Sequence, residues 1–218
     1  MLFRSWRKID ALRETWHIPD DAPVIGFVGR LTRDKGIPEL FAAFERLLPD
    51  FPDVRLLLVG DAEQGDPLAD DLLRRLQTHP NVVLTGAIKE VALYYGVFDL
   101  LAFPSHREGF PNVPLEAASA GLPVVGFKAT GTIDAVVDGT TGTLVEIGDV
   151  DGLTSALSDY LREPFLRKRH GEAGRRRAAK NFRREDIWLA LVQNYRSHLI
   201  SKRLPVPQPR PTRRARAA

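Results

Sequence analysis

Six short runs of apolar residues recur along the first two thirds of the chain, and each has the length of a β-strand. Most of the runs are continuously apolar rather than alternating, which is typical of strands covered on both faces of a sheet. The runs occupy residues 24–29, 54–60, 82–84, 100–103, 123–127 and 142–145. The pattern therefore predicts about six buried strands.

Helical patterns separate these runs, and Leu40, Phe41 and Phe44 recur as they would on the core-facing side of a crossover helix. The helical patterns occupy residues 37–48, 67–78, 89–97, 114–120, 132–137 and most of 150–199. This alternation predicts an α/β protein with a doubly wound parallel sheet flanked by helices. Ligands bind such sheets at the carboxyl ends of the strands. The candidate ligand-binding loops therefore follow Val28, Val59, Leu84, Phe103 and Phe127.

The pattern divides the chain into three segments. Residues 1–20 are predicted to be a linker or the remnant of an interdomain segment, and residues 21–200 a single folded domain. Residues 201–218 mix Pro with Arg and Ala, a composition that cannot form a packed core. We expect this last segment to be a disordered basic tail.

Composition narrows the function classes. The chain has 44% hydrophobic and 27% charged residues, as globular proteins do. Its lack of Cys excludes disulfide scaffolds, thiol nucleophiles and Cys-ligated zinc. No apolar run approaches the ~20 residues of a spanning helix, and the N-terminus lacks the apolar core of a signal peptide. A cytoplasmic location is therefore expected.

The net charge of +3 is distributed unevenly. Residues 1–161 carry 14 basic and 24 acidic side chains, whereas residues 162–184 carry 10 basic and 2 acidic ones. Such a basic stretch is usually a solvated helix face, and the alternative is contact with an anionic surface. Peripheral contact of residues 162–184 with an anionic membrane is therefore a hypothesis, and no specific nucleic-acid partner is expected.

The loop after the first predicted strand contains two cations five residues apart. Gly29 permits a tight turn, and Arg30 and Lys35 can converge on one polyphosphate without a metal ion. The loop is not a P-loop, because no Gly-Lys-Ser/Thr sequence follows the turn. The alternative is that both cations are ordinary loop residues paired with Asp34 or Glu39.

The loop after the fourth predicted strand contains two carboxylates. Glu108 lies in the loop, and Glu116 is expected in the first turn of a helix that has Pro114 near its start. The backbone N–H groups of Gly109, Phe110 and Asn112 would then face the crevice. A carboxylate can accept two hydrogen bonds from a vicinal diol such as a sugar. The alternatives are a glycosidase-type acid/base pair, or simple stabilisation of the helix and loop.

Together these segments resemble a known family. Gly29-Arg30-Leu31 with Lys35-Gly36, the stretch from Glu108 to Ala117, and Gly121-Leu122-Pro123 are similar to the donor-binding domain of GT4-family glycosyltransferases. Glu108 and Glu116 match that family's EX7E signature. Further along, Thr132 and Asp134 stand where the family usually has Gly and Glu. The resemblance implies that this chain is a Rossmann-like domain forming the C-terminal half of a GT-B fold.

The resemblance also implies roles for residues. Arg30 and Lys35 would hold the diphosphate of a UDP- or GDP-sugar and stabilise the leaving group, with no metal required. Glu108 would contact the donor sugar, Glu116 the ribose, and the segment at Gly86 the base. The catalytic candidates are therefore Arg30, Lys35 and Glu108, and the donor-binding candidates are Gly29, Arg30, Lys35, Gly86, Glu108, Gly109, Phe110, Pro111, Asn112, Leu115 and Glu116.

The expected activity is transfer of a hexose-type sugar, with retention, to a saccharide or lipid-linked acceptor in polysaccharide or glycolipid biosynthesis. Such enzymes need an N-terminal acceptor domain, which a separate chain or a homodimer could supply. The alternatives are a non-catalytic nucleotide-sugar-binding module and a truncated inactive fragment. A dehydrogenase and a serine hydrolase are disfavoured, because Gly-x-Gly-x-x-Gly after the first strand and Gly-x-Ser-x-Gly are both absent. A glycosidase leaves Arg30 and Lys35 unexplained.

Overall fold

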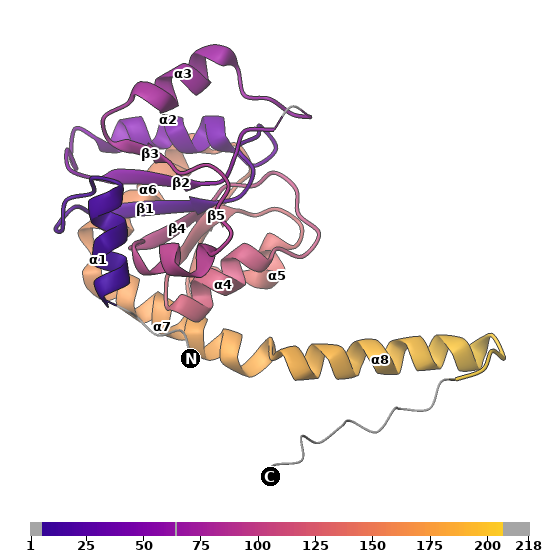
Figure 1. Ribbon diagram of the computed structural model, residues 1–218. Helices are drawn as coiled ribbons and strands as arrows, with labels where there is room; N and C mark the ends of the chain where they lie inside the picture. The colour runs from indigo at the N-terminus through magenta and orange to yellow at the C-terminus, as the bar shows by residue number, and fades with distance from the viewer. Residues whose placement is uncertain (1–5, 64, 207–218) are drawn as a thin grey trace, which may run out of the picture. The chain divides into compact units, whose positions relative to one another are not determined.

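The computed structural model describes residues 6–63 and 65–206. Six parallel strands form one sheet in the order β3-β2-β1-β4-β5-β6 (Figure 1). The strands are β1 (Val24–Val28), β2 (Arg55–Val59), β3 (Val82–Leu84), β4 (Leu100–Phe103), β5 (Val124–Phe127) and β6 (Gly142–Val145). The predicted α/β class and the six predicted strands are confirmed.

The helices follow the predicted alternation, with small shifts at their ends. They are α1 (Trp6–Thr15), α2 (Ile37–Leu47), α3 (Asp70–Thr78), η1 (Val91–Gly96), α4 (Asn112–Ala120), α5 (Thr132–Ala135), α6 (Val150–Arg162), α7 (Pro164–Asn181) and α8 (Arg184–Ser201). The segment η1 is a 3₁₀-helix. None of the helices in the described ranges is long and apolar enough to cross a membrane.

The sheet has a hydrophobic core on each face. On one face, α2 and α6 pack together and cover alternate strand residues such as Ile25 and Phe27. On the other face, α1, η1 and α4 cover Val24 and Val28. Because side chains of a strand point alternately to the two faces, both sets must be apolar. This explains why the central strands read as continuous apolar runs.

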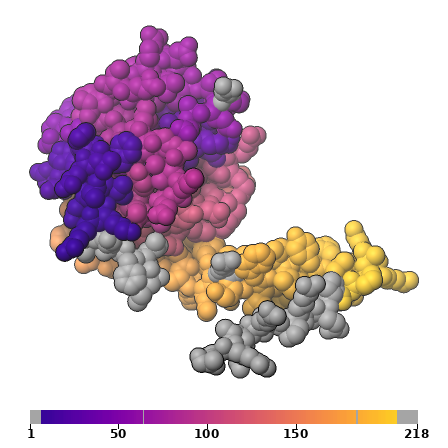
Figure 2. Space-filling model, in the orientation of Figure 1, coloured from indigo at the N-terminus to yellow at the C-terminus, as the bar shows by residue number. Residues whose placement is uncertain are grey.

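The first helix packs on the rest of the domain. Arg13 donates to the carbonyls of Pro19 and Ala22 at 2.7 Å, and Trp16 Nε1 donates to Tyr94 Oη at 3.3 Å. Figure 2 shows α1 as an indigo surface beside a magenta part of the chain, and α1 contacts η1, which follows β3. The helix lies inside the segment predicted as a linker, and the linker role itself stays a prediction.

The chain divides into two compact units, residues 1–179 and residues 180–218. The second unit contains α8, whose large apolar side chains are exposed. They are Ile187, Trp188, Leu189, Leu191, Val192, Tyr195 and Ile200. The residues expected to form the disordered tail lie mostly outside the described residues, which end at 206.

Candidate functional site

The loops after β1 and β4 lie next to each other, because these two strands are hydrogen-bonded neighbours in the sheet. Along the chain, β2 and β3 on one side of β1 come before β4, β5 and β6 on its other side. At such a reversal of strand order the two loops leave on opposite faces, and a crevice opens between them. The candidates Gly29, Arg30, Lys35, Gly86 and Glu108 lie in loops that follow strands at this carboxyl edge, and the remaining candidates lead into or lie within α4.

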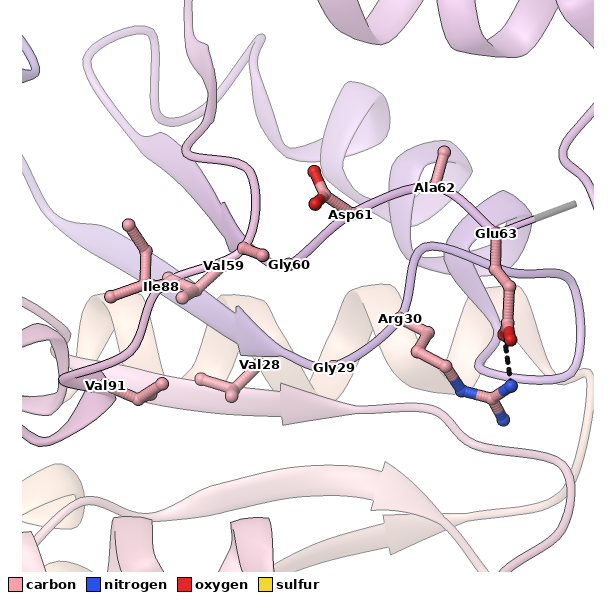
Figure 3. A pocket seen from close by; sticks show the side chains of 11 residues that line it. Val28, Gly29, Arg30, Val59, Gly60, Asp61, Ala62, Glu63, Ile88 and Val91 are labelled. Atoms are coloured by element: carbon pink, nitrogen blue, oxygen red, sulfur yellow. Dashed lines mark hydrogen bonds and ion pairs between the residues drawn. The ribbon is translucent and has the colours of Figure 1, made fainter.

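A cavity of about 450 Å³ lies at the carboxyl ends of β1 and β2 (Figure 3). Its apolar side is formed by Val28, Val59, Ile88 and Val91. Its opposite side carries polar and charged groups, which are Arg30, Asp61 and Glu63, together with the backbone of Gly29, Gly60 and Ala62. A cavity with one apolar wall and a charged rim suits a flat ring that carries a polar substituent.

Of the predicted donor-site residues, this cavity contains Gly29 and Arg30. Gly86 lies next to it and forms a backbone bridge with Gly60, and the following residues Ala87 and Ile88 line it. The segment at Gly86, which was predicted to bind the base, is therefore adjacent to this cavity. Lys35, Glu108 and Glu116 do not line it.

Arg30 is held by two carboxylates. Its guanidinium hydrogen-bonds to Glu63 and lies 3.9 Å from Asp34. The Arg30 side chain is 56% exposed, and an exposed ion pair contributes little to stability. Arg30 can therefore exchange Glu63 for another anion at small cost. No pattern in the sequence pointed to Glu63.

Lys35 and Glu108 form the most enclosed ion pair of the crevice. Lys35 Nζ lies 2.6 Å from Glu108 Oε1, and the two side chains are only 16% and 14% exposed. The contact joins the loop after β1 to the loop after β4. Lys35 and Glu108, which were candidates in separate loops, are thus in contact. The alternative expectation paired Lys35 with Asp34 or Glu39 instead.

Gly36 fixes the position of Lys35. It has φ 71° at the N-cap of α2, in the left-handed region that favours glycine. A Cβ at this position would lie 2.0 Å from the Pro104 carbonyl oxygen, so no larger residue fits. Next to it, the His106 N–H donates to the Asp34 carbonyl at 2.9 Å. Backbone contacts thus hold the β1–α2 loop against the end of β4.

The Asp34 carboxylate lies close to the same cations. Burial works against its ionisation, but the hydrogen bond from Thr32 and the charges of Lys35 and Arg30 lower the pKa of Asp34 below its usual value. Asp34 therefore stays charged at neutral pH and contributes a negative charge beside Arg30. A ligand with several negative charges would compete with it for these cations.

Glu116 is held by a buried tyrosine. The Tyr95 hydroxyl donates to Glu116 Oε2 at 2.7 Å, and Tyr95 is 5% exposed. Burial, followed by the hydrogen bond and charge of Glu116, raises the pKa of Tyr95, so the phenol stays protonated as the donor. Glu116 lies in the second turn of α4 rather than the first, because the helix begins at Asn112. No pattern in the sequence pointed to Tyr95.

The start of α4 supplies the remaining candidates. Pro111 is the N-cap and makes no side-chain capping hydrogen bond. Gly109, Phe110 and Asn112 are exposed, whereas Leu115 is half-buried. An exposed helix N-terminus without a side-chain cap presents N–H groups to an anion or a hydroxyl. The orientation of the N–H groups in this segment toward the crevice stays a prediction.

His106 is engaged in structural contacts. Its Nε2 lies 2.9 Å from Glu39 Oε1, and its ring packs edge-on against Phe127 at a centroid distance of 5.5 Å. These contacts favour a structural role. Within the described ranges, no three His, Asp or Glu side chains come together as a metal site would require.

The fold and the site define a class of protein. Residues 8–177 match the family model of the group 1 glycosyl transferases, and the chain belongs to this family. The capsular polysaccharide biosynthesis glycosyltransferase CapM of Staphylococcus aureus is 35% identical over 189 residues, which are 86% of this chain and 50% of CapM. The chain spans about half the length of the curated relatives it matches.

Solved structures agree with this assignment. The crystal structure of Anabaena HepE with UDP-glucose is 25% identical, has a TM-score of 0.79, and covers 88% of this chain and 53% of HepE. The C-terminal domain of LpcC from Francisella tularensis has 24% identity and a TM-score of 0.70, and covers 79% of this chain and 93% of that domain. At that identity the likeness to LpcC concerns the fold alone.

Breaking the Lys35–Glu108 pair should destabilise the domain. Lys35→Met leaves a carboxylate in an enclosed site without its cation, so we expect a loss of about 1–3 kcal/mol in the free energy of unfolding. Adding Glu108→Gln removes the unpaired charge, and the double variant should be less destabilised than the sum of the two single variants. Urea unfolding of all four proteins measures this coupling.

The exposed pair Arg46–Asp151 provides the matched control. Its cycle, with Arg46→Met and Asp151→Asn, should be additive within about 0.5 kcal/mol. Equal coupling in the two cycles would show that the Lys35–Glu108 pair has no special role in holding the two loops together.

Proposed function

We propose that this chain is the donor-binding half of a retaining glycosyltransferase. The donor is a UDP- or GDP-sugar, and a hexose-type sugar is transferred to a saccharide or lipid-linked acceptor in polysaccharide or glycolipid biosynthesis. The observation that carries the proposal is the convergence of Lys35 and Glu108 at the crevice, 2.6 Å apart, with Arg30 on the same loop as Lys35. Family membership and the UDP-glucose complex of HepE support it.

The donor would lie along the crevice in a defined order. The base would enter the cavity beside Ile88 and Val91, whose apolar side chains suit one face of a flat ring. The ribose hydroxyls would bond the Glu116 oxygen that does not accept from Tyr95. The diphosphate would bind Arg30 and Lys35.

Binding would exchange partners within the site. The diphosphate oxygens would replace Glu63 at Arg30 and Glu108 at Lys35. Glu108 would then be free to accept hydrogen bonds from the sugar hydroxyls. Backbone contacts already hold the β1–α2 loop that carries both cations, so the exchange would change side-chain partners and leave the loop backbone in place.

The same residues would promote the chemical step. The bond between the anomeric carbon and the diphosphate oxygen breaks, and its electron pair leaves with the nucleotide. Arg30 and Lys35 would stabilise the negative charge that develops on the leaving diphosphate oxygen. Fixed cations contribute most where charge develops in the transition state. This arrangement requires no metal ion. The hydroxyl oxygen of the acceptor would form the new bond to the anomeric carbon, and its proton would pass to the departing phosphate oxygen. We expect a second domain to hold the acceptor, since the relatives are about twice as long as this chain.

The first prediction concerns the diphosphate. Arg30→Ala or Lys35→Ala should each weaken binding of UDP or GDP by about 1.5–3 kcal/mol, because each removes a charge-assisted hydrogen bond. Isothermal titration calorimetry measures the affinity. Arg33→Ala is the control, since it removes an exposed cation from the same loop. Unchanged affinity in both test variants would remove the diphosphate assignment.

A second prediction distinguishes the proposed roles of Glu108 and Glu116. Glu116→Ala should weaken nucleoside and nucleotide-sugar binding alike, whereas Glu108→Ala should act mainly when the sugar is present. Tyr95→Phe should reproduce part of the Glu116→Ala loss, because the carboxylate then loses its fixed orientation. If Glu108→Ala weakened binding of the free nucleoside equally, the proposed division of roles would be wrong.

A third prediction concerns transfer. The 218-residue chain should bind a nucleotide sugar but transfer the sugar poorly or not at all, since the relatives it matches are about twice as long. Product formation from radiolabelled donor, with and without an added N-terminal domain of a relative, measures this. Robust transfer by the chain alone would contradict the need for an acceptor domain. Binding without turnover even with the added domain would favour a non-catalytic binding module.

A further inference from the structure

A second cavity lies at the edge of the sheet opposite to the donor crevice. Its volume is about 420 Å³, and it is bounded by the residues that precede β4 and β5 and by α7. Because all six strands are parallel, this is the amino edge of the sheet. We propose that this cavity binds a phosphate group through Lys168 and Arg175. The proposal is independent of the donor site.

The walls of the cavity are held firmly in place. Helix α7 approaches the turn after α4 so closely that a Cβ at Gly171 would lie 2.0 Å from the Gly121 carbonyl oxygen. Gly171 itself is buried. In addition, the turn is closed by its own backbone, since the Leu122 N–H donates to the Ala117 carbonyl at 3.0 Å. The basic helix and the turn therefore form a fixed concave surface rather than two loose segments.

Lys168 and Arg175 face this surface together. They are seven residues apart on α7, a spacing that places both side chains on one side of a helix, and both line the cavity. Within the part of the chain that the structure describes, neither has a carboxylate partner within 4 Å. Helix α7 carries seven basic residues and one acidic residue, so neighbouring charges do not compensate them.

The carboxylates that line the same cavity have other partners. Asp99 Oδ2 accepts from the Val24 N–H at 2.8 Å, and Asp99 Oδ1 lies 4.0 Å from Arg167 Nε. Glu172 lies 3.9 Å from Arg176. Arg167 in turn donates to the Leu161 carbonyl at 3.1 Å. Lys168 and Arg175 are thus the two cations of the cavity that have no such contacts.

A phosphate group matches this pair chemically. An arginine offers a fork of donors and a lysine a point charge, and phosphate presents several acceptor oxygens to both. The cavity is larger than one phosphate, which leaves room for the group that carries it. That carrier is either a lipid headgroup or a small soluble phosphate, and the two sources share the same recognition chemistry.

The test uses a double variant, Lys168→Gln with Arg175→Gln. NMR titration with inorganic phosphate should shift the amide signals of Gly121 and Leu122 in the native chain. The double variant should bind about tenfold more weakly at this site, because two charge-assisted contacts are lost. Signals of Gly29 report phosphate in the donor crevice separately. The control, Lys8→Gln with Arg74→Gln, changes the net charge equally at exposed positions elsewhere.

Sedimentation with vesicles distinguishes the source of the phosphate. One set contains phosphatidylcholine alone, and the other adds phosphatidic acid. Phosphate-induced shifts that the double variant loses and the control keeps support a soluble ligand. Co-sedimentation with phosphatidic acid vesicles that only the double variant loses supports a lipid headgroup. The proposal is overturned if neither probe binds, or if the control variant loses binding as much as the double variant.

Discussion

The reversal of strand order between β1 and β4 is the constraint on which the crevice depends. β1 is followed along the chain by β2 and β3 on one side, and β4 begins the other side of the sheet. Ile25 pairs with Leu100, so the two strands end at similar heights and their loops meet. The Lys35–Glu108 contact is a consequence, since it joins loops that are 73 residues apart in the sequence. A sheet with any other neighbour for β1 would separate these two charges.

Much of this arrangement was predictable from the sequence, because it follows from local patterns. Continuous apolar runs identify strands buried on both faces, and their ends locate the loops in which Arg30, Lys35 and Glu108 lie. Side-chain partners across the fold were not predictable. The Tyr95–Glu116 hydrogen bond depends on how a short 3₁₀-helix packs beside α4, and no spacing in the sequence encodes that contact. The same holds for Glu63 beside Arg30.

The charges of the crevice are already balanced before any ligand is present. Arg30 and Lys35 each lie against a carboxylate of the same domain. A ligand would therefore have to replace an existing partner, and the net gain is a difference between two interactions rather than the strength of one. The enclosed Lys35 pair sets a higher threshold for replacement than the exposed Arg30 pair does. A doubly charged group that engages both cations can replace the two carboxylate partners more readily than a single carboxylate can.

The close approach of Gly36 to the Pro104 carbonyl has a consequence for how the chain can vary. A side chain at position 36 would push the β1–α2 loop away from β4 and move the Lys35 ammonium with it. Substitution of exposed Arg30, in contrast, leaves the backbone unchanged and removes only one charge. In a comprehensive mutational scan, the least tolerant position of this loop would then be one that takes no part in chemistry. Evolution could replace the charges of the crevice one at a time, but it could not easily replace the residue that brings them together.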